Sequence, residues 1–296
     1  MERSKFIEIR FGDQLIKDKI FNSRKRIVSG CKICLGSGFA ASYQESMKKM
    51  YCKCMKQFMV EKNLILSGVP LEALDLLNKM RKAKSMIDVE YKQVFLDVNE
   101  HNIRDINRSK KLYEDLLMPY IKNAASAVPR GDSLLIFGAN SRGKTWALYY
   151  LAICLMDVFS VLFMPLKDLF IYINNAYYGS DNNRDAAFAK QHAMDMLSLI
   201  RDVDVLLLDE GSKLVKFSDS VSVQLEGVVK ERIGNNKVVA MSSNHTPLDF
   251  HRQFGSQVVS AFIKDCYSAH LMTGPDLRHM AMVKSGAFEY VSKGSK

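Results

Sequence analysis

The octapeptide 138–145 constrains the fold of this 296-residue chain more than any other feature. It matches the phosphate-loop pattern G-x-x-x-x-G-K-[ST] in full. Its residues are Gly138, Ala139, Asn140, Ser141, Arg142, Gly143, Lys144 and Thr145. A short apolar run at 133–137 precedes it, and a helix-forming run that begins at Trp146 follows it. Because strand, glycine loop and helix are the context that the pattern requires, we predict a parallel α/β domain that binds a nucleoside triphosphate.

The residue types in this loop specify the chemistry that we expect. Glycines allow backbone N–H groups to close around phosphates, and the following helix adds the positive end of its dipole. Lys144 is expected to reach the β- and γ-phosphates, and the Thr145 hydroxyl to bind Mg²⁺. We include Trp146 among the nucleotide-contacting residues. ATP and Mg²⁺ are thus the expected cofactors.

A second apolar run ends in two carboxylates. Residues Val205 to Leu208 predict a strand buried on both faces, and Asp209 and Glu210 follow it directly, 64 and 65 residues after Thr145. Ligands of open α/β sheets bind at the carboxyl ends of the strands. We therefore expect Asp209 to lie beside the Mg²⁺, and Glu210 to orient or activate the attacking water.

Two further residues are candidates for the same site. A third predicted strand, 237–244, ends in small polar residues, and Asn244 would lie beside the other strand ends, near the γ-phosphate or the water. The alternative is that Asn244 closes a turn before Pro247. Arg278 follows a short predicted strand at 269–272, and it either reaches a bound nucleotide or is an ordinary surface arginine.

Four of the six cysteines form two close pairs near the N-terminus: Cys31, Cys34, Cys52 and Cys54. Two such pairs can supply the four thiolates of a tetrahedral structural Zn²⁺, although the second pair is spaced more tightly than usual. The alternatives are four free thiols or a redox pair. Because this region has few large aliphatic residues, we expect bound metal to supply much of its folding energy.

Positive charge is concentrated in the same region. The whole chain has a formal net charge of +10, and residues 1–60 hold 13 Lys or Arg against five Asp or Glu. A basic balance favours a polyanionic partner such as nucleic acid. The basic side chains near the cysteines could contact phosphates or an acidic protein surface, or they could form a solvated face.

One apolar stretch, Trp146 to Leu166, is long enough to span a bilayer. We interpret it instead as a helix and a strand separated at 157–160, because it directly follows the phosphate loop. The polar N-terminus is unlike a secretory signal. We therefore expect a cytoplasmic protein with no membrane partner.

The order of these motifs resembles the AAA+ ATPases of the DnaC/DnaI/IstB group, and most closely the DnaI-like helicase loaders, which also carry an N-terminal zinc-binding domain. The resemblance covers roughly residues 30–280, and a short segment at 67–70 resembles the one that opens the ATPase part of that group. It implies a P-loop AAA+ ATPase domain, with a parallel sheet flanked by helices, after a small zinc-binding module. The predicted divisions are 1–66 for the basic module, 67–128 for a helical connector and 129–296 for the ATPase domain.

The resemblance also implies a function. The basic module would dock on a hexameric replicative helicase, and the ATPase domain would self-associate, touch single-stranded DNA and help to place the helicase on it. ATP binding and slow hydrolysis would act as the switch. Asn244 becomes a sensor-one residue and Arg278 a sensor-two arginine.

The chain also departs from the group's pattern. Ser141 and Arg142 replace the Gly-rich middle of the loop seen in many relatives. Ala261 occupies the expected position of the arginine finger, so that Lys264 or Arg252 substitutes for it or hydrolysis in trans is weak. This divergence is compatible with a phage or plasmid origin and with an infected host cell as the location.

Two rival functions share the same motifs: an IstB-like transposition accessory ATPase that acts on duplex DNA, and a non-hydrolysing adaptor whose ATPase part is kept as a nucleotide-dependent fold.

Overall fold

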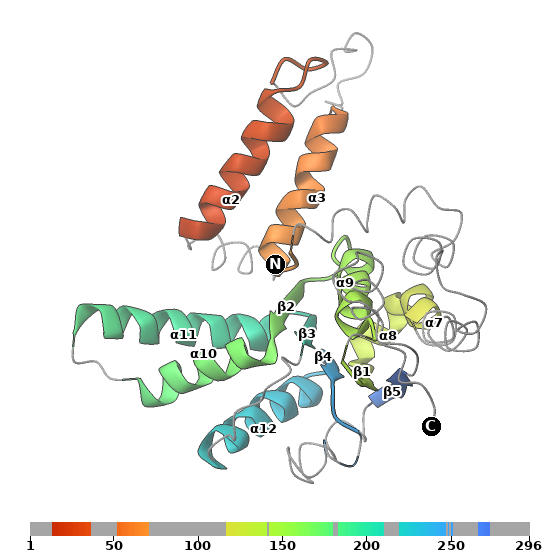
Figure 1. Ribbon diagram of the computed structural model, residues 1–296, viewed down its shortest axis with the longest axis vertical. Helices are drawn as coiled ribbons and strands as arrows, with labels where there is room; N and C mark the ends of the chain where they lie inside the picture. Colours follow the sequence, from red (N-terminus) through yellow and green to blue (C-terminus); the bar gives the residue numbers. More distant parts are fainter. Residues whose placement is uncertain are drawn as a thin grey trace, which may run out of the picture.

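Short apolar runs form a parallel sheet at the centre of the computed structural model (Figure 1). The structure describes residues 14–36, 52–70, 117–140, 142–179, 183–209, 219–246, 248, 250 and 266–272. The strands are β1 (Ser133–Gly138), β2 (Val161–Pro165), β3 (Val205–Asp209), β4 (Val238–Ser243) and β5 (Cys266–Met272). Their order is β2-β3-β4-β1-β5, and all neighbours pair in parallel. The predicted α/β class with a parallel sheet is confirmed.

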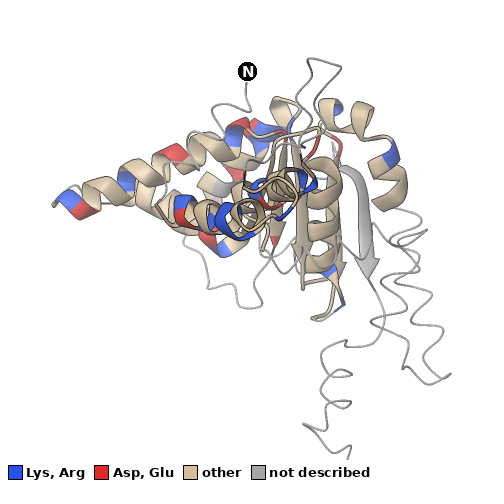
Figure 2. Cartoon of the chain, turned by 90° about the horizontal axis from the view of Figure 1, so that it is seen from above, with Lys and Arg blue, Asp and Glu red and all other residues tan. Residues whose placement is uncertain are grey.

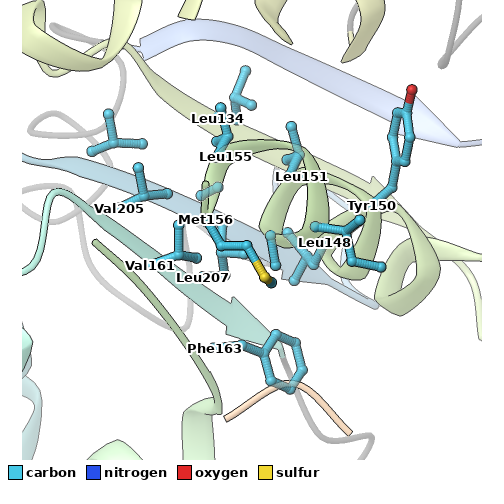
Figure 3. Packing of buried hydrophobic residues seen from close by; sticks show 14 of the residues in the cluster. Leu134, Leu148, Tyr150, Leu151, Leu155, Met156, Val161, Phe163, Val205 and Leu207 are labelled. Carbon is cyan, nitrogen blue, oxygen red and sulfur yellow. The ribbon is translucent and has the colours of Figure 1, made fainter. Parts of the chain in front are cut away.

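Helices cover both faces of this sheet, as the strand pattern requires. Successive side chains of a strand point to opposite faces, and those of β1 divide accordingly: Leu134 and Ile136 join one buried cluster, whereas Leu135 and Phe137 join another. Figure 3 shows part of the first cluster, where β-strand residues meet one apolar helix. The first cluster contains residues of α7 (Met118–Lys122), α8 (Ala124–Arg130) and α9 (Lys144–Leu155). The second contains residues of α10 (Leu166–Tyr178), α11 (Arg184–Asp202) and α12 (Asp219–Gly234).

The apolar stretch after the loop divides as predicted. α9 ends at Leu155, a turn follows, and β2 begins at Val161. α9 is buried in the first cluster, whereas β2 places Val161 and Phe163 in the first cluster and Leu162 and Met164 in the second, so it is apolar on both faces. Among the described residues, none of the helices combines the length and apolar character needed to cross a membrane.

The N-terminal hairpin consists of α2 (Gln14–Arg24), the π-helical turn η1 (Lys25–Ser29) and α3 (Lys53–Ser67). α2 and α3 lie side by side in Figure 1, and the end of α2 that continues into η1 lies far from the sheet. At the other end, Leu64 and Val69 are buried in the first cluster of the sheet domain. α3 therefore joins the hairpin to the main core. The proposed boundary at 66 lies at its C-terminal end, and the division into domains stays a prediction.

A buried carboxylate fixes the hairpin internally. Glu61 of α3 is fully buried and accepts hydrogen bonds from Ser23 Oγ (2.7 Å) and from Arg26 Nη2 (2.5 Å). Since a buried charge is costly unless paired, this contact specifies how α2 and η1 pack against α3.

A buried arginine fixes α12 at the end of the sheet where strands β3 and β4 begin. The Arg232 guanidinium is fully buried and donates to the carbonyl oxygens of Ile200, Val203 and Val238, at 3.0 Å for Val203 and 2.7 Å for Val238. Burial lowers its pKa to about 9, so the side chain remains charged at neutral pH. One cation therefore ties the end of α11 and the beginnings of β3 and β4 to α12.

Candidate nucleotide site and cysteine cluster

The phosphate loop connects the carboxyl end of β1 to the first turn of α9. Gly138 has φ +152° and Gly143 has φ +87°, a region that disfavours residues with a Cβ. Gly143 is the N-cap of α9, so the loop turns directly into the helix and brings its N-terminal N–H groups to the same place. Ser141 lies outside the described residues. The remaining seven residues have the strand–loop–helix arrangement that the sequence predicts.

The Lys144 ammonium is held inside the loop. Its side chain is nearly buried, and Nζ donates to the carbonyl oxygens of Gly138 (2.7 Å) and Ala139 (2.8 Å). Lysine offers three donors on a flexible stem, so the charge can be shared between these carbonyls and an anion. This geometry puts a cation where the loop pattern expects phosphates.

The acidic strand reaches the same site. Thr145 Oγ1 donates to Asp209 Oδ2 at 2.9 Å, across 64 residues of sequence. Asp209 is the last residue of β3, and Thr145 lies in the first turn of α9. The two residues expected to hold Mg²⁺ are thus brought together. A hydroxyl and a carboxylate oxygen are ligands that Mg²⁺ prefers, so the donor set fits this ion.

Two more residues of the region suit a nucleotide. Arg142 Nη1 is buried and has no hydrogen-bond partner among the described residues, which fits a donor directed at an anion. Trp146 is 42% exposed, and its ring meets Tyr149 edge to face at 5.6 Å. Tyr149 in turn packs on Phe163 of β2, with ring centroids 4.9 Å apart. The exposed indole is therefore packed against aromatic side chains that connect it to the sheet.

Asn244 follows β4 at the same edge of the sheet. The register pairs Ser243 with Phe137, so Asn244 comes next to the start of the phosphate loop. Its side chain is half-buried. Glu210 and Arg278 lie outside the described residues, as do Arg252, Ala261 and Lys264. Their roles stay predictions.

The sequence did not predict the hydrogen bond between Ser242 and Asp209. Ser242 is fully buried on β4, and its Oγ donates to Asp209 Oδ1 at 2.5 Å. The only signal in the sequence is a polar residue at the end of an apolar run. Which acceptor it meets depends on the pairing of β4 with β3, which the sequence does not show.

The four cysteines of the hairpin converge as predicted. Their sulfur atoms lie within 4.8 Å of one another, with Cys31 Sγ 4.0 Å from Cys52 Sγ and Cys34 Sγ 3.4 Å from Cys54 Sγ. Tetrahedral Zn²⁺ with Zn–S bonds near 2.3 Å needs sulfurs about 3.8 Å apart, so the donor set fits zinc. Burial raises the pKa of the Cys54 thiol, with a smaller contribution from its hydrogen bond to Cys34.

Cys154, on α9, is separate from this cluster. Burial raises the pKa of its thiol to about 11. It is therefore a neutral thiol at physiological pH and fills space beside the first buried cluster.

Basic residues surround the cysteine cluster. The described part of the hairpin, 14–36 and 52–70, holds nine Lys or Arg and two Asp or Glu. Figure 2 shows the molecule from above, with Lys and Arg in blue and Asp and Glu in red. The hairpin also exposes Ile33 (69%) and Leu35 (88%) in the turn that carries Cys34.

No protein-family model matches the chain, and no curated protein matches its sequence. Several solved structures are similar to it. A crystal structure of the DnaC helicase loader has 20% identity and a TM-score of 0.44, over 62% of this chain and 99% of that one. DnaI has 17% identity and a TM-score of 0.41, over 63% of this chain and 93% of that one. AMPPCP-bound DnaA from Aquifex aeolicus has 15% identity and a TM-score of 0.42, over 61% and 53%.

Helicase loaders, the group that the motifs resemble, are thus among the solved structures similar to this chain.

Proposed function

We propose that this protein is an ATP-dependent loader that docks on a hexameric replicative helicase and helps to place it on single-stranded DNA. The observation that carries the nucleotide part is the hydrogen bond from Thr145 to Asp209, which joins the phosphate loop to the acidic strand. The motif resemblance to the DnaI-like loaders carries the helicase part.

Each residue of the site has a distinct role in this proposal. The loop from Gly138 to Gly143 and the N-terminus of α9 bind the phosphates, and Lys144 and Arg142 supply positive charge. Thr145 and Asp209 hold Mg²⁺, which stabilises the charge on the phosphate oxygens when bound. Glu210 orients the attacking water, Asn244 contacts the γ-phosphate or that water, and Arg278 contacts the nucleotide.

The sequence favours hydrolysis that is slow or stimulated by a partner. An arginine finger contributes about 10³-fold or more to hydrolysis, and Ala261 occupies its expected position. A chain without that cation would remain long in the ATP state. We infer that ATP binding, more than rapid hydrolysis, sets the state of the protein.

The N-terminal hairpin is the docking module. Four thiolates would hold Zn²⁺, which when bound links the two ends of the hairpin loop. The nine basic residues of its described part favour an acidic surface on the helicase, and the exposed Ile33 and Leu35 provide apolar contact area. Self-association of the ATPase domain and contact with single-stranded DNA belong to the same proposal.

Co-purification tests the function against its rivals. Tagged protein is mixed with the replicative helicase of its own organism, with and without ATP and Mg²⁺, and the helicase retained is measured. Retention that depends on the hairpin and changes with ATP is expected. Capture of a transposase instead of the helicase would support the IstB-like alternative. Retention of the helicase without ATP turnover, even with single-stranded DNA present, would support the adaptor.

A further inference from the structure

The carboxylate of Asp209 is held at both oxygens. Thr145 Oγ1 donates to Oδ2 at 2.9 Å, and Ser242 Oγ donates to Oδ1 at 2.5 Å. The donors come from different elements, α9 and β4. β4 lies between β1 and β3, and Ser242 pairs with Ile136 while its neighbour Met241 pairs with Leu208. Ser242 therefore ties the acidic strand end to the centre of the sheet.

These two hydrogen bonds differ in their position relative to the expected magnesium ion. The oxygen of Thr145 is itself an expected Mg²⁺ ligand, so its hydrogen bond to Asp209 belongs to the ion's own coordination site. Ser242 is fully buried at the other carboxylate oxygen, and it can keep its hydrogen bond with and without the ion. A partner of this kind keeps a metal-binding carboxylate in one orientation.

The placement of Ser242 also requires an explanation. It follows four buried apolar residues of β4, where a hydroxyl costs free energy unless it is hydrogen-bonded. A hydrogen bond to a charged acceptor compensates for that cost. Its neighbour Ser243 is also buried, but its Oγ accepts from the backbone N of His245. Adjacent residues of a strand face opposite sides, so only Ser242 meets Asp209.

We propose that Ser242 is a positioning residue for magnesium: it fixes the Asp209 carboxylate in the orientation that binds the ion beside Thr145. The inference rests on the proposed nucleotide site and adds a residue to it. Ser242 acts through Asp209, so its effect should appear only where Mg²⁺ contributes to binding.

The test compares ATP affinity with Mg²⁺ and with chelator, by calorimetric titration of the full chain. We call the ratio of the ATP affinity with Mg²⁺ to the ATP affinity with chelator the magnesium gain. Ser242→Ala should leave the affinity in chelator within about twofold and reduce the magnesium gain about 10-fold. Ser243→Ala is the matched control, because it removes a neighbouring buried hydroxyl and should keep the full gain. Ser242→Thr, which retains the hydroxyl, should restore most of it.

A double substitution separates positioning from general damage. If Ser242 acts through Asp209, then Asp209→Asn with Ser242→Ala should bind Mg·ATP no worse than Asp209→Asn alone. A full magnesium gain in Ser242→Ala, or equal losses with and without Mg²⁺, would overturn the proposal. So would a loss in Ser243→Ala as large as that in Ser242→Ala. A wild-type chain that binds no ATP in either condition would instead overturn the nucleotide site itself.

Discussion

Three residues of the site, Lys144, Thr145 and Asp209, could be predicted because each belongs to a motif that is continuous in the sequence. Thr145 and Asp209 were expected to share a magnesium ion, and the structure brings them to hydrogen-bonding distance. Ser242 could not be predicted, because its role depends on the register between β3 and β4. A residue whose partner lies on a neighbouring strand carries no local sequence signal.

The role predicted for Glu210, to orient or activate the attacking water, depends on the sequence alone. Glu210→Gln should keep ATP binding and lower turnover about 100-fold or more, because a general base contributes at least that much. Steady-state phosphate release, measured beside equilibrium ATP binding, checks both halves. Glu226→Gln, at a half-buried position of α12 where Glu226 pairs with Lys230, is the control. Unchanged turnover in Glu210→Gln would remove this residue from the role.

At the scale of elements, apolar runs predicted the strands well because buried parallel strands are apolar on both faces. The predicted runs at 133–137 and 205–208 lie within β1 and β3, each one residue short of the end. The strand order could not be derived, since it depends on how helices cross over the sheet. The hydrogen bonds of the buried Arg232 to backbone carbonyl oxygens were not predicted either, because an arginine in a helix usually indicates a solvated face.

Arg232 gives the first prediction about elements. Arg232→Met should lower the free energy of unfolding by about 3 kcal/mol, because the buried carbonyl oxygens of Ile200 in α11, Val203 before β3 and Val238 in β4 lose their donor. Urea denaturation measures the change. Lys230→Met, an exposed position two residues earlier, should cost less than about 1 kcal/mol. A similar small loss of unfolding free energy at both positions would contradict the stabilising role of Arg232.

Asp204 gives a pH-dependent prediction at the beginning of β3. Burial alone would raise its pKa, but hydrogen bonds from the Ser160 backbone and hydroxyl and from Lys237 outweigh it and lower the pKa below 3.8. A carboxyl with a lowered folded-state pKa stabilises the protein above its unfolded pKa, and this contribution disappears as the pH falls through the lower, folded-state pKa.

Asp204→Asn should therefore reduce stability at pH 7, by about 1 kcal/mol. The difference in free energy of unfolding between the variant and the wild type should shrink as the pH falls from about 4 towards the lowered pKa. Denaturation curves at a series of pH values measure it. A difference that stays constant between pH 7 and pH 3 would show that the ionised carboxylate is not what stabilises this contact.

At the scale of the whole molecule, the sequence predicted a cysteine-bearing basic module and an α/β domain, and the structure contains both. It did not predict that the chain would continue from the cysteine cluster through α3 into the main core, where Leu64 and Val69 are buried. Such a junction depends on long-range packing, which the charge asymmetry between the parts does not reveal. Residues 71–116, most of the predicted connector, lie outside the described residues.

The cysteine cluster gives the prediction at this scale. Metal analysis of purified protein should find about one Zn²⁺ per chain, and the Cys31→Ser/Cys34→Ser double variant should lose it. Cys154→Ser should retain it, because that thiol is outside the cluster. Chelation should unfold the hairpin and lower the helical circular dichroism signal, since zinc binding is coupled to folding. A metal-free hairpin that keeps its helical signal would contradict the zinc assignment.

The central claim is that a triphosphate binds where the loop from β1 enters α9, opposite Asp209. Titration of the wild-type chain, Lys144→Ala and the exposed control Lys167→Ala with ATP and Mg²⁺ tests it most directly. We expect saturable binding by the wild type and by Lys167→Ala, and affinity at least about 100-fold weaker in a folded Lys144→Ala. ATP affinity that is equal in all three proteins, or absent from the wild type, would contradict the claim.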